Sequence, residues 1–376
     1  MVTLTNLIMH LTNSILPHNQ NKVLLFFKKG KSKVLFLCKQ RENSPKMLKD
    51  DVLKIILREN DYISGETISH KLGVSRAAVN TAVKALREDG YEITSSTNKG
   101  YLLKNCPDLL SKGSISSLLP DTRAEKLFYI DSVDSTNNVL KSLASEGAVS
   151  GTVVIADHQT GGKGRRGRSF ASPPGVGVYL SYLFKPESGF DKISDLTSWT
   201  AVAVADAIRN AYGLDSRIKW VNDLLMNRKK ICGILTEVSV EGESGFIDTC
   251  IIGIGVNVNE SEFPLEISDI ATSISIENGG MKFVRSKLAS EIIKSMDKLA
   301  SDWPDSSYYL DRYRDLNITT GSRITAFPRM AENGQGRTGT AISINDDFSL
   351  KVEFTDGSIE DLKSGEVSVR GLYGYT

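Results

Sequence analysis

The segment GGKGRRGR, from Gly161 to Arg168, is the most informative part of this sequence. It mixes four glycines with four basic residues and contains no acidic or bulky apolar side chain. Glycine lets a ligand approach the backbone closely, and clustered Lys and Arg side chains neutralise a polyanion such as a nucleoside triphosphate. The spacing fits neither a Walker A loop nor a dinucleotide fingerprint. Taken alone, the loop has two interpretations: a catalytic loop, or a solvated loop that contacts nucleic acid.

The composition limits the class of protein. A length of 376 residues suffices for about two or three domains. The net charge is only +1, so any nucleic-acid contact must come from a local patch. The four cysteines show no metal-ligand spacing, the four histidines are scattered, and neither a secretory signal nor a membrane-length apolar run is present. We therefore expect a cytoplasmic protein with reduced thiols, no metal site built from its own side chains and no membrane contact.

The first 46 residues differ from those that follow. They combine the apolar and basic patches VLLFFKK (23–29) and VLFL (34–37) with polar segments. Two β-strands are possible there, but they would have few partners. We interpret residues 1–46 as an unstructured leader or non-native extension, with Met47 as the natural start.

Residues 47–106 have the pattern of a winged helix-turn-helix DNA-binding domain. Apolar residues at helical spacing begin at Leu48, a second helix runs from Ser64 to a glycine turn at Gly73, and a third follows from Arg76 to Arg87. Strand-like segments at 91–94 and 101–103 then enclose a polar turn, which predicts the wing. The expected DNA contacts are the polar residues of the third helix and one wing lysine: Arg76, Asn80, Thr81, Lys84 and Lys99. The alternative is a protein-interaction module that never binds DNA. Residues 107–125 are expected to be a linker.

Residues 126–317 predict a mixed α/β domain in which polar motifs follow buried strands. Strand patterns occur at 126–130, 152–157, 178–184, 217–220, 230–237 and 250–259, and helices at 196–212, 284–303 and 307–316. The polar motifs are DSTNN (134–138), the loop at 161–168, KWVND (219–223), KICGILTE (230–237) and GIGVNVN (253–259).

This ordered set of motifs resembles the motif series of the biotin protein ligases. The winged helix in front makes the chain similar to their bifunctional form, the biotin operon repressors, from about Met47 to the C-terminus. The resemblance implies that the biotin carboxylate attacks the α-phosphate of ATP, with Mg²⁺ sharing the charge, to give biotinyl-5′-adenylate and release pyrophosphate. A lysine of a biotin carboxyl carrier protein then displaces AMP. It also implies binding to operator DNA as a homodimer that forms when the adenylate is held.

The resemblance also assigns residues to roles. Lys219 and Arg165 would be catalytic, with the Lys219 ammonium between the biotin carboxylate and the α-phosphate. Without the motif, Lys219 would be interpreted as a solvated lysine at a strand end. The biotin-binding set is Ser135, Thr136, Asn137, Gln159, Gly162, Lys163, Gly164, Arg165 and Lys219. The ATP-binding set is Arg165, Arg166, Arg168, Phe170, Asn222, Lys230, Asn257, Glu366 and Arg370.

Three positions depart from the family pattern or stay ambiguous. Lys163 stands where many members have arginine, which keeps the charge but loses the bidentate fork. Phe170 replaces a tryptophan that covers the adenine in some members. Trp220 is either a core aromatic, which we favour, or a wall of the ligand pocket.

The C-terminal residues 318–376 alternate apolar and polar side chains between turns, which predicts a small SH3-like β-barrel. Glu366 and Arg370 near its end would help hold ATP by resemblance, or would be ordinary surface charges of a strand. The fold class is thus α+β: a winged helix-turn-helix, a mixed-sheet domain of the biotin/lipoate ligase type and the barrel. Two other functions stay open, a ligand-sensing repressor without ligase activity and a lipoate-type ligase.

Overall fold

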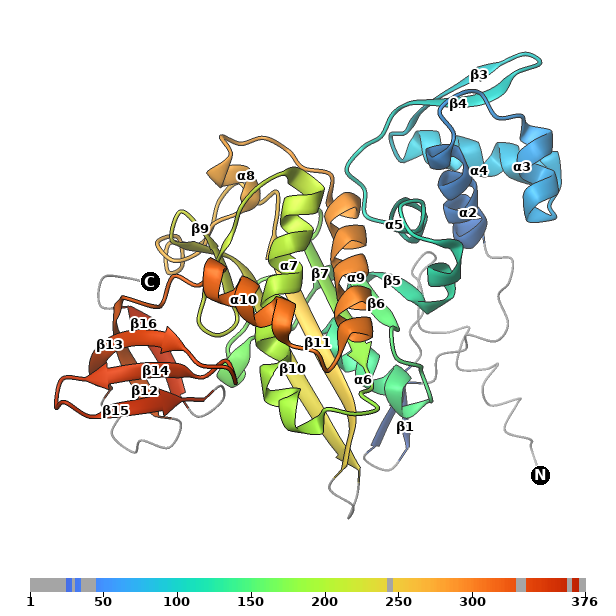
Figure 1. Cartoon of the computed structure of the whole chain (residues 1–376). Helices are drawn as coiled ribbons and strands as arrows, with labels where there is room; N and C mark the ends of the chain where they lie inside the picture. The colour runs from blue at the N-terminus through green and yellow to red at the C-terminus, as the bar shows by residue number, and fades with distance from the viewer. Residues whose placement is uncertain are drawn as a thin grey trace, which may run out of the picture. The chain divides into compact units, whose positions relative to one another are not determined.

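The computed structural model describes residues 25–28, 31–34, 45–241, 246–328, 336–363 and 367–371. The chain divides into two units, residues 1–44 and 45–376. In the first unit, β1 (Leu25–Lys28) and β2 (Lys31–Val34) pair as an antiparallel hairpin (Figure 1). The two strands that the sequence allowed are therefore present; residues 45 and 46 of the expected leader belong to the next helix, and the rest of it lies outside the described residues.

The winged helix-turn-helix is confirmed. It consists of α2 (Pro45–Arg58), α3 (Gly65–Leu72), α4 (Arg76–Glu88), β3 (Glu92–Ser96) and β4 (Gly100–Asn105). Ser64 and Ser75 cap α3 and α4 through their hydroxyls, and Gly73 ends α3 in the left-handed conformation. Helix α2 begins at Pro45, two residues before the expected boundary; proline suits the first position of a helix, where the backbone N–H that it lacks would have no helical partner.

The turn of the wing depends on one glycine. Gly100 has a φ of 102°, and a Cβ there would lie 2.1 Å from the Ile63 carbonyl oxygen. The neighbouring Tyr101 exchanges backbone hydrogen bonds with Ile63 at 2.8 and 2.9 Å. The wing is therefore attached to the segment before α3, which fixes it relative to the helices.

The expected linker at residues 107–125 is folded, which corrects that expectation. It contains α5 (Lys112–Ser116) and the start of a 3₁₀ helix, η1 (Asp121–Lys126). Leu110, Ile115 and Leu119 belong to the core of the catalytic domain. The Gly113 N–H donates to the Asp50 carboxylate of α2 at 3.0 Å. The local sequence of this segment favours a helix only weakly. The helix is stabilised by burial of its apolar side chains against the catalytic domain and by the hydrogen bond to α2.

A seven-stranded mixed sheet forms the centre of the second unit, with the order β5-β6-β7-β11-β10-β9-β8. Strand β5 pairs parallel with β6, and the other neighbours are antiparallel. The strands are β5 (Leu127–Val133), β6 (Val153–Gln159), β7 (Gly177–Phe184), β8 (Arg217–Lys219), β9 (Asp223–Met226), β10 (Lys229–Glu241) and β11 (Phe246–Asn257). This order brings the polar motifs after β6, β8 and β11 toward the start of helix α6 (Thr136–Ser145).

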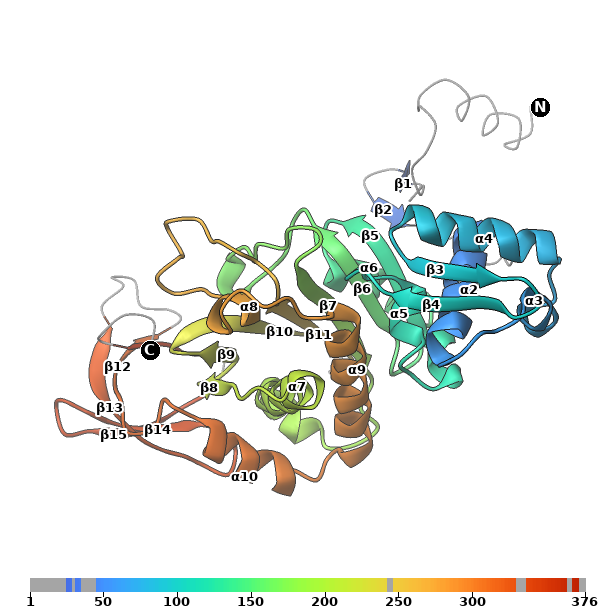
Figure 2. The same cartoon turned by 90° about the horizontal axis from the view of Figure 1, so that it is seen from above.

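Helices cover the sheet. Figures 1 and 2 show α7 (Leu196–Tyr212) and α9 (Arg285–Asp302) side by side over one face. Alanines along α7 permit this close approach, and Trp199 stacks on Tyr309 of α10 (Ser307–Leu316) with ring centroids 4.6 Å apart. The shorter helices are η2 (Arg165–Gly167), η3 (Phe190–Asp195) and α8 (Ile274–Glu277). None of the described helices is long and apolar enough to cross a membrane.

The C-terminal residues form an antiparallel sheet with the order β15-β14-β13-β12-β16. Its strands are β12 (Arg323–Pro328), β13 (Arg337–Ile344), β14 (Leu350–Phe354), β15 (Ile359–Leu362) and β16 (Val367–Gly371). The Trp220 indole N–H donates to the Phe348 carbonyl at 2.9 Å, and Arg314 donates to the Ile344 carbonyl at 2.9 Å. These bonds attach the small sheet to the end of the catalytic domain that carries KWVND.

Candidate functional site

The polar motifs meet at one pocket of about 50 Å³. The start of α6, the end of β6, the glycine-basic loop and the facing segments of β10 and β11 supply its walls. The lining residues are Ser135, Thr136, Asn137, Gln159, Lys163, Gly164, Arg165, Phe170, Leu180, Asn222, Lys230, Gly233, Ile234, Leu235, Gly253, Ile254 and Gly255. Motifs that are far apart in the chain therefore form a single site, as the sequence predicts.

Hydrogen bonds fix the polar end of the pocket. Gln159 Oε1 accepts from the Thr136 N–H at 2.9 Å, and Gln159 Nε2 donates to Ser172 Oγ at 2.9 Å. The Ser135 side chain, although it stands at the N-cap of α6, makes no capping hydrogen bond. The α6 N-terminus therefore presents Ser135 and Thr136 toward the pocket, where they can bind a small polar group.

A buried network continues behind this end of the pocket. Ser181 Oγ lies 2.8 Å from Thr136 Oγ1 and 2.5 Å from Asn137 Oδ1. Asn137 Nδ2 donates to Glu237 Oε2 at 2.7 Å, and Lys141 Nζ donates to Glu237 Oε1 at 2.6 Å. Desolvation opposes ionisation of Glu237, but the hydrogen bonds from Lys141 and Asn137 outweigh it and lower the pKa of this carboxyl.

The basic side chains converge from two segments, the glycine-basic loop and the start of β10. Lys163 donates to Asn138 Oδ1 at 2.8 Å, and Arg165 donates to Asn222 Oδ1 at 2.8 Å. Lys230 forms an ion pair with Asp223 at 2.7 Å. The arrangement concentrates cations beside the polar pocket and can neutralise two anionic groups held there.

Phe170 forms the wall at the glycine-rich strands. A Cβ at Gly255 would lie 2.6 Å from its ring, and one at Gly233 would lie 3.4 Å from it. The Phe170 ring meets Tyr179 edge-on, with centroids 6.4 Å apart. The two glycines therefore provide the space in which the aromatic side chain packs against β10 and β11.

Some of the expected ligand residues lie outside the lining. Lys219 is buried, with 7% of its surface exposed, so it is not a solvated strand-end lysine, but it is not one of the lining residues. Asn257 donates to the Thr272 carbonyl at 3.0 Å, so its side chain holds backbone in this structure rather than facing the pocket. Arg168 is exposed. Gly162 is buried, and a Cβ there would lie 2.3 Å from the Phe170 carbonyl oxygen.

Other expectations fall on residues or side chains that are not described. Glu366 lies outside the described residues, and for Arg166 and Arg370 only the backbone is described. Trp220 is buried and is not a lining residue, which fits the core interpretation.

Sequence reasoning missed the residues that support the pocket from behind, namely Asn138, Lys141, Ser172, Ser181 and Glu237. Glu237 is the last residue of the KICGILTE motif. Its place in that motif is a signal of a functional role, although no role was assigned to Glu237. Ser181 lies in a strand of mostly apolar residues, where a serine is readily interpreted as an ordinary core residue.

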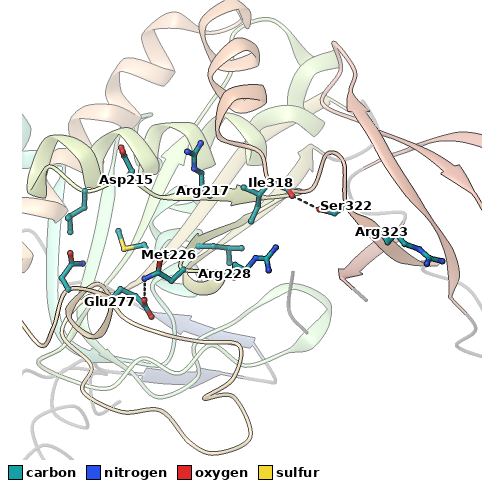
Figure 3. A pocket seen from close by; sticks show the side chains of 12 residues that line it. Asp215, Arg217, Met226, Arg228, Glu277, Ile318, Ser322 and Arg323 are labelled. Carbon is teal, nitrogen blue, oxygen red and sulfur yellow. Dashed lines mark hydrogen bonds between the residues drawn. The ribbon is translucent and has the colours of Figure 1, made fainter. Parts of the chain in front are cut away.

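A larger cavity of about 690 Å³ lies elsewhere, at the β8 and β9 end of the sheet (Figure 3). Arg217, Arg228 and Arg323 line it, and Asn227 donates to Glu277 at 2.6 Å beside them. None of the expected ligand residues is part of its lining. Size alone does not identify a site, whereas convergent polar groups do, so the smaller pocket is the candidate functional site.

The expected DNA contacts are accessible. Arg76, Asn80, Thr81 and Lys84 are exposed on α4, while Val79, Ala82, Val83 and Leu86 of the same helix are buried. Lys99 in the wing lies over the Tyr62 ring at 5.8 Å.

Among the described residues, no three His, Cys, Asp or Glu side chains are grouped to hold a metal ion.

Comparison with known proteins gives two family matches. Residues 129–257 match the biotin/lipoate A/B protein ligase family, and residues 49–102 match a helix-turn-helix domain. The first match covers the pocket motifs from α6 to β11, and the second covers the segment from α2 into β4.

Individual relatives agree. The chain is 36% identical to the bifunctional ligase/repressor BirA of Bacillus subtilis over 330 residues, which cover 86% of this chain and 98% of the relative. It is 28% identical to the protein of the same name from Escherichia coli, over 85% of this chain and 97% of the relative. The biotin protein ligase from Aquifex aeolicus in complex with biotin and ATP aligns with a TM-score of 0.55 and 28% identity, over 65% of this chain and 98% of that chain.

Proposed function

Because the chain belongs to the family of bifunctional ligase/repressors, we propose that it activates biotin with ATP and transfers it to a lysine of a biotin carboxyl carrier protein. The observation that carries this proposal is the pocket itself, where the Ser-Thr-Asn junction, the basic loop and the glycine strands meet. The polar end suits the ureido ring of biotin. The cations beside it suit a carboxylate and a triphosphate held together.

The basic residues stabilise the negative charges of the reacting groups in the first step, the formation of the adenylate. The biotin carboxylate and the α-phosphate repel each other, and Arg165 and Lys163 reduce that repulsion from the loop. Lys219 stabilises the negative charge that develops as the carboxylate oxygen bonds to the α-phosphorus. Arg166, Arg168, Asn222 and Lys230 hold the nucleotide, and Phe170 covers its base.

Ligand entry requires the loop to move. The pocket volume of about 50 Å³ is far below the roughly 300–1,000 Å³ of typical small-molecule sites. Lys163 and Arg165 are held inward by Asn138 and Asn222 at 2.8 Å each. Binding exchanges these two hydrogen bonds for bonds to the ligand, so the same loop closes over biotin and its carboxylate.

Mg²⁺ accompanies the nucleotide in this proposal. The described residues do not offer a cluster of three acidic or imidazole ligands, and Asp223 is already paired with Lys230. A triphosphate supplies oxygen ligands of its own, which is how Mg²⁺ is usually held. The ion lowers the negative charge of ATP when it is bound.

The winged helix gives the second function. The exposed face of α4 with Arg76, Asn80, Thr81 and Lys84 enters the major groove, and Lys99 in the wing contacts phosphate. We infer that the chain forms a homodimer when it holds biotinyl-5′-adenylate and then represses an operator with two-fold symmetry. We also infer that the five C-terminal strands close into an SH3-like barrel, and that Glu366 and Arg370 help to hold ATP.

The test is biotin-dependent exchange of labelled pyrophosphate into ATP. Wild-type exchange is expected to fall about a hundredfold or more in Lys219→Ala and Lys219→Met. Methionine keeps most of the buried volume, so a loss in both variants is not due to a cavity. Lys298→Ala, in an exposed ion pair on α9, is the matched control.

Each other outcome has a defined meaning. A wild type that is inert with biotin and with lipoate would contradict the ligase. Exchange with lipoate alone would identify the lipoate-type ligase. Undiminished exchange in both Lys219 variants would leave the enzyme but remove Lys219 from its mechanism.

A further inference from the structure

We propose that one face of α2 holds the winged helix-turn-helix in a fixed position on the catalytic domain, so that the chain selects operators by the spacing of their two half-sites. This face, here called the α2 stripe, consists of Lys46, Asp50, Lys54 and Arg58. The inference rests on the proposed function, because it takes a homodimer on a two-fold operator as its premise. It goes beyond that function by naming the residues that decide which operators fit.

The DNA-binding domain and the catalytic domain have separate apolar cores. Val52 and Leu53 of α2 belong to the first core, together with Val79 and Val83 of α4. Helix α5 belongs to the second, since its Ile115 is fully buried there. Figures 1 and 2 show α5 between α2 and α9, and α5 contacts both of these helices. The recognition helix α4 is therefore connected to the catalytic domain through α2 and α5.

The α2 stripe has the period of a helix. Its four residues follow one another at intervals of four, so their side chains lie on one face and span about 18 Å of the helix. Val52 and Leu53 stand two and three positions after Asp50, so they lie on a different face, toward α4. The face of α2 that meets α5 is therefore polar, and the junction depends on hydrogen bonds and ion pairs.

Arg58 binds the end of α5 and the segment after it. Its guanidinium donates to three backbone carbonyls at 3.1, 3.1 and 2.6 Å, those of Ser116, Ser117 and Leu119. It also pairs with the Asp121 carboxylate at 2.7 Å, and Lys54 pairs with the same carboxylate at 2.8 Å. Because a guanidinium is planar and its donors have fixed directions, these bonds together fix the approach of this segment to α2.

The start of α5 touches α2 through backbone atoms. A Cβ at Gly113 would lie 2.5 Å from the Asp50 carbonyl oxygen and 2.9 Å from the Asp50 Cα. The Gly113 N–H donates to Asp50 Oδ1 at 3.0 Å in a buried hydrogen bond. One turn earlier, Lys46 pairs with Asp131 of β5 at 2.5 Å. Only glycine permits so close an approach, so α5 is held against α2 at both of its ends.

A junction held at both ends has a consequence for DNA. In a homodimer, the two recognition helices then stand at one separation and one relative orientation. Two extra base pairs between the half-sites move one half-site by about 7 Å and turn it by about 70° relative to the other. DNA-binding domains in a fixed position cannot follow that displacement, whereas domains on a flexible connection can.

The decisive variant combines Asp50→Ala with Arg58→Met. It removes the acceptor for the Gly113 N–H and the donors to the α5 carbonyls, and it leaves both apolar cores and the exposed face of α4 unchanged. The matched control combines Glu59→Ala with Lys71→Met. This control removes the same charges from an exposed ion pair inside the DNA-binding domain, at 3.4 Å.

A second variant reaches the same junction by another route. Gly113→Ala keeps every side chain of the α2 stripe but places a carbon against the Asp50 backbone, which forces α5 away from α2. We expect it to lose the spacing preference as the double variant does. Thermal unfolding and pyrophosphate exchange within about twofold of the wild type establish that both junction variants are folded, because the pocket is a separate site.

The probe is a two-fold duplex selected from random-sequence DNA by the wild-type chain with biotin and ATP, compared with the same duplex lengthened by two base pairs at its centre. Fluorescence anisotropy gives the Kd for each. The ratio of the two Kd values is the readout, because a uniform change in DNA affinity cancels in it. We expect a ratio of at least about tenfold for the wild type and the control, and below about threefold for the junction variants.

Each other result counts against the proposal in a different way. A wild-type ratio in either junction variant, with exchange intact, would overturn it and leave operator binding in place. A ratio near one for the wild type would show that spacing is not selected, and would overturn it too. A wild type that enriches no DNA sequence would overturn the proposed repression itself.

Discussion

At the scale of single residues, the pocket depends on glycines that make room for neighbouring side chains. Gly255 is such a residue, because a Cβ there would lie 2.6 Å from the Phe170 ring. We expect Gly255→Ala to displace Phe170, raise the KM for ATP and destabilise the fold by about 1–3 kcal/mol. Pyrophosphate exchange at varied ATP measures this. Gly113→Ala, where the added carbon would lie 2.5 Å from the Asp50 carbonyl oxygen and outside the pocket, is the control. Equal KM values in the two variants would contradict the placement of Phe170.

A second residue gives a pH dependence. Burial raises the pKa of the Asp195 carboxyl to about 6, although a hydrogen bond from Ser194 lowers it. A raised pKa means that the folded state prefers the protonated form. This contribution to stability is fully present below the unfolded value of 3.8 and is lost as the pH rises through about 6.

We therefore expect Asp195→Asn to be more stable than the wild type at pH 7.5 by at most about 3 kcal/mol, with the gain shrinking toward pH 4. Urea unfolding at several pH values measures the difference. A gain that is the same at pH 4 and pH 7.5 would show that the titration of Asp195 is not its cause.

At the scale of elements, the exposed face of α4 is expected to bind DNA without taking part in catalysis. Arg76→Ala and Lys84→Ala should each weaken operator binding, and each lost phosphate contact should reduce the salt dependence by about one unit of slope. Binding measured at several salt concentrations, with pyrophosphate exchange beside it, tests this. Wild-type operator affinity in both variants, or a parallel loss of exchange, would contradict separate functions for α4 and the pocket.

The elements also show what sequence could predict. Strong periodicity predicted α7 and α10 with the bounds that the structure gives. It missed α5, whose sequence KGSIS has low helix propensity and forms because Ile115 is buried and Ser111 supplies a capping box. It also missed β9, since DLLM is too short for a pattern. Both depend on tertiary contacts that no local window contains.

The pocket likewise combines residues that the sequence predicts with residues that depend on tertiary contacts. Ten of the expected ligand residues line the pocket, namely Ser135, Thr136, Asn137, Gln159, Lys163, Gly164, Arg165, Phe170, Asn222 and Lys230. The same reasoning expected Asn257 to face the ligand, and its amide instead holds the Thr272 carbonyl. The supporting positions of Glu237 and Ser181 were not predicted, since their partners lie on α6, far away in the sequence.

At the scale of the whole molecule, one buried arginine connects the segment after the wing to the catalytic domain. Arg285 is 1% exposed and pairs with Asp108 at 2.9 Å and Asp157 at 2.7 Å. It also donates to the carbonyls of Asp108 and Gly177. Asp108 in turn accepts from Asn259 at 2.9 Å, just beyond the GIGVN motif.

We expect Arg285→Met to destabilise the chain by about 3–5 kcal/mol, because two carboxylates remain without their cation. Replacing both partners as well, with Asp108→Asn and Asp157→Asn, should recover part of that loss. Denaturant unfolding of the single and triple variants measures both. A triple variant less stable than Arg285→Met would mean that the arginine acts by packing alone.

By the proposed function, this chain joins biotin to a carrier protein through an ATP-dependent step. The intact mass of a purified biotin carboxyl carrier domain, after incubation with the chain, biotin and ATP, tests this. We expect the carrier to gain one biotinyl group on one lysine, and we expect no gain when ATP is omitted or when Lys219→Met is used. An unmodified carrier, in a preparation that the Bacillus subtilis ligase does modify, would contradict it.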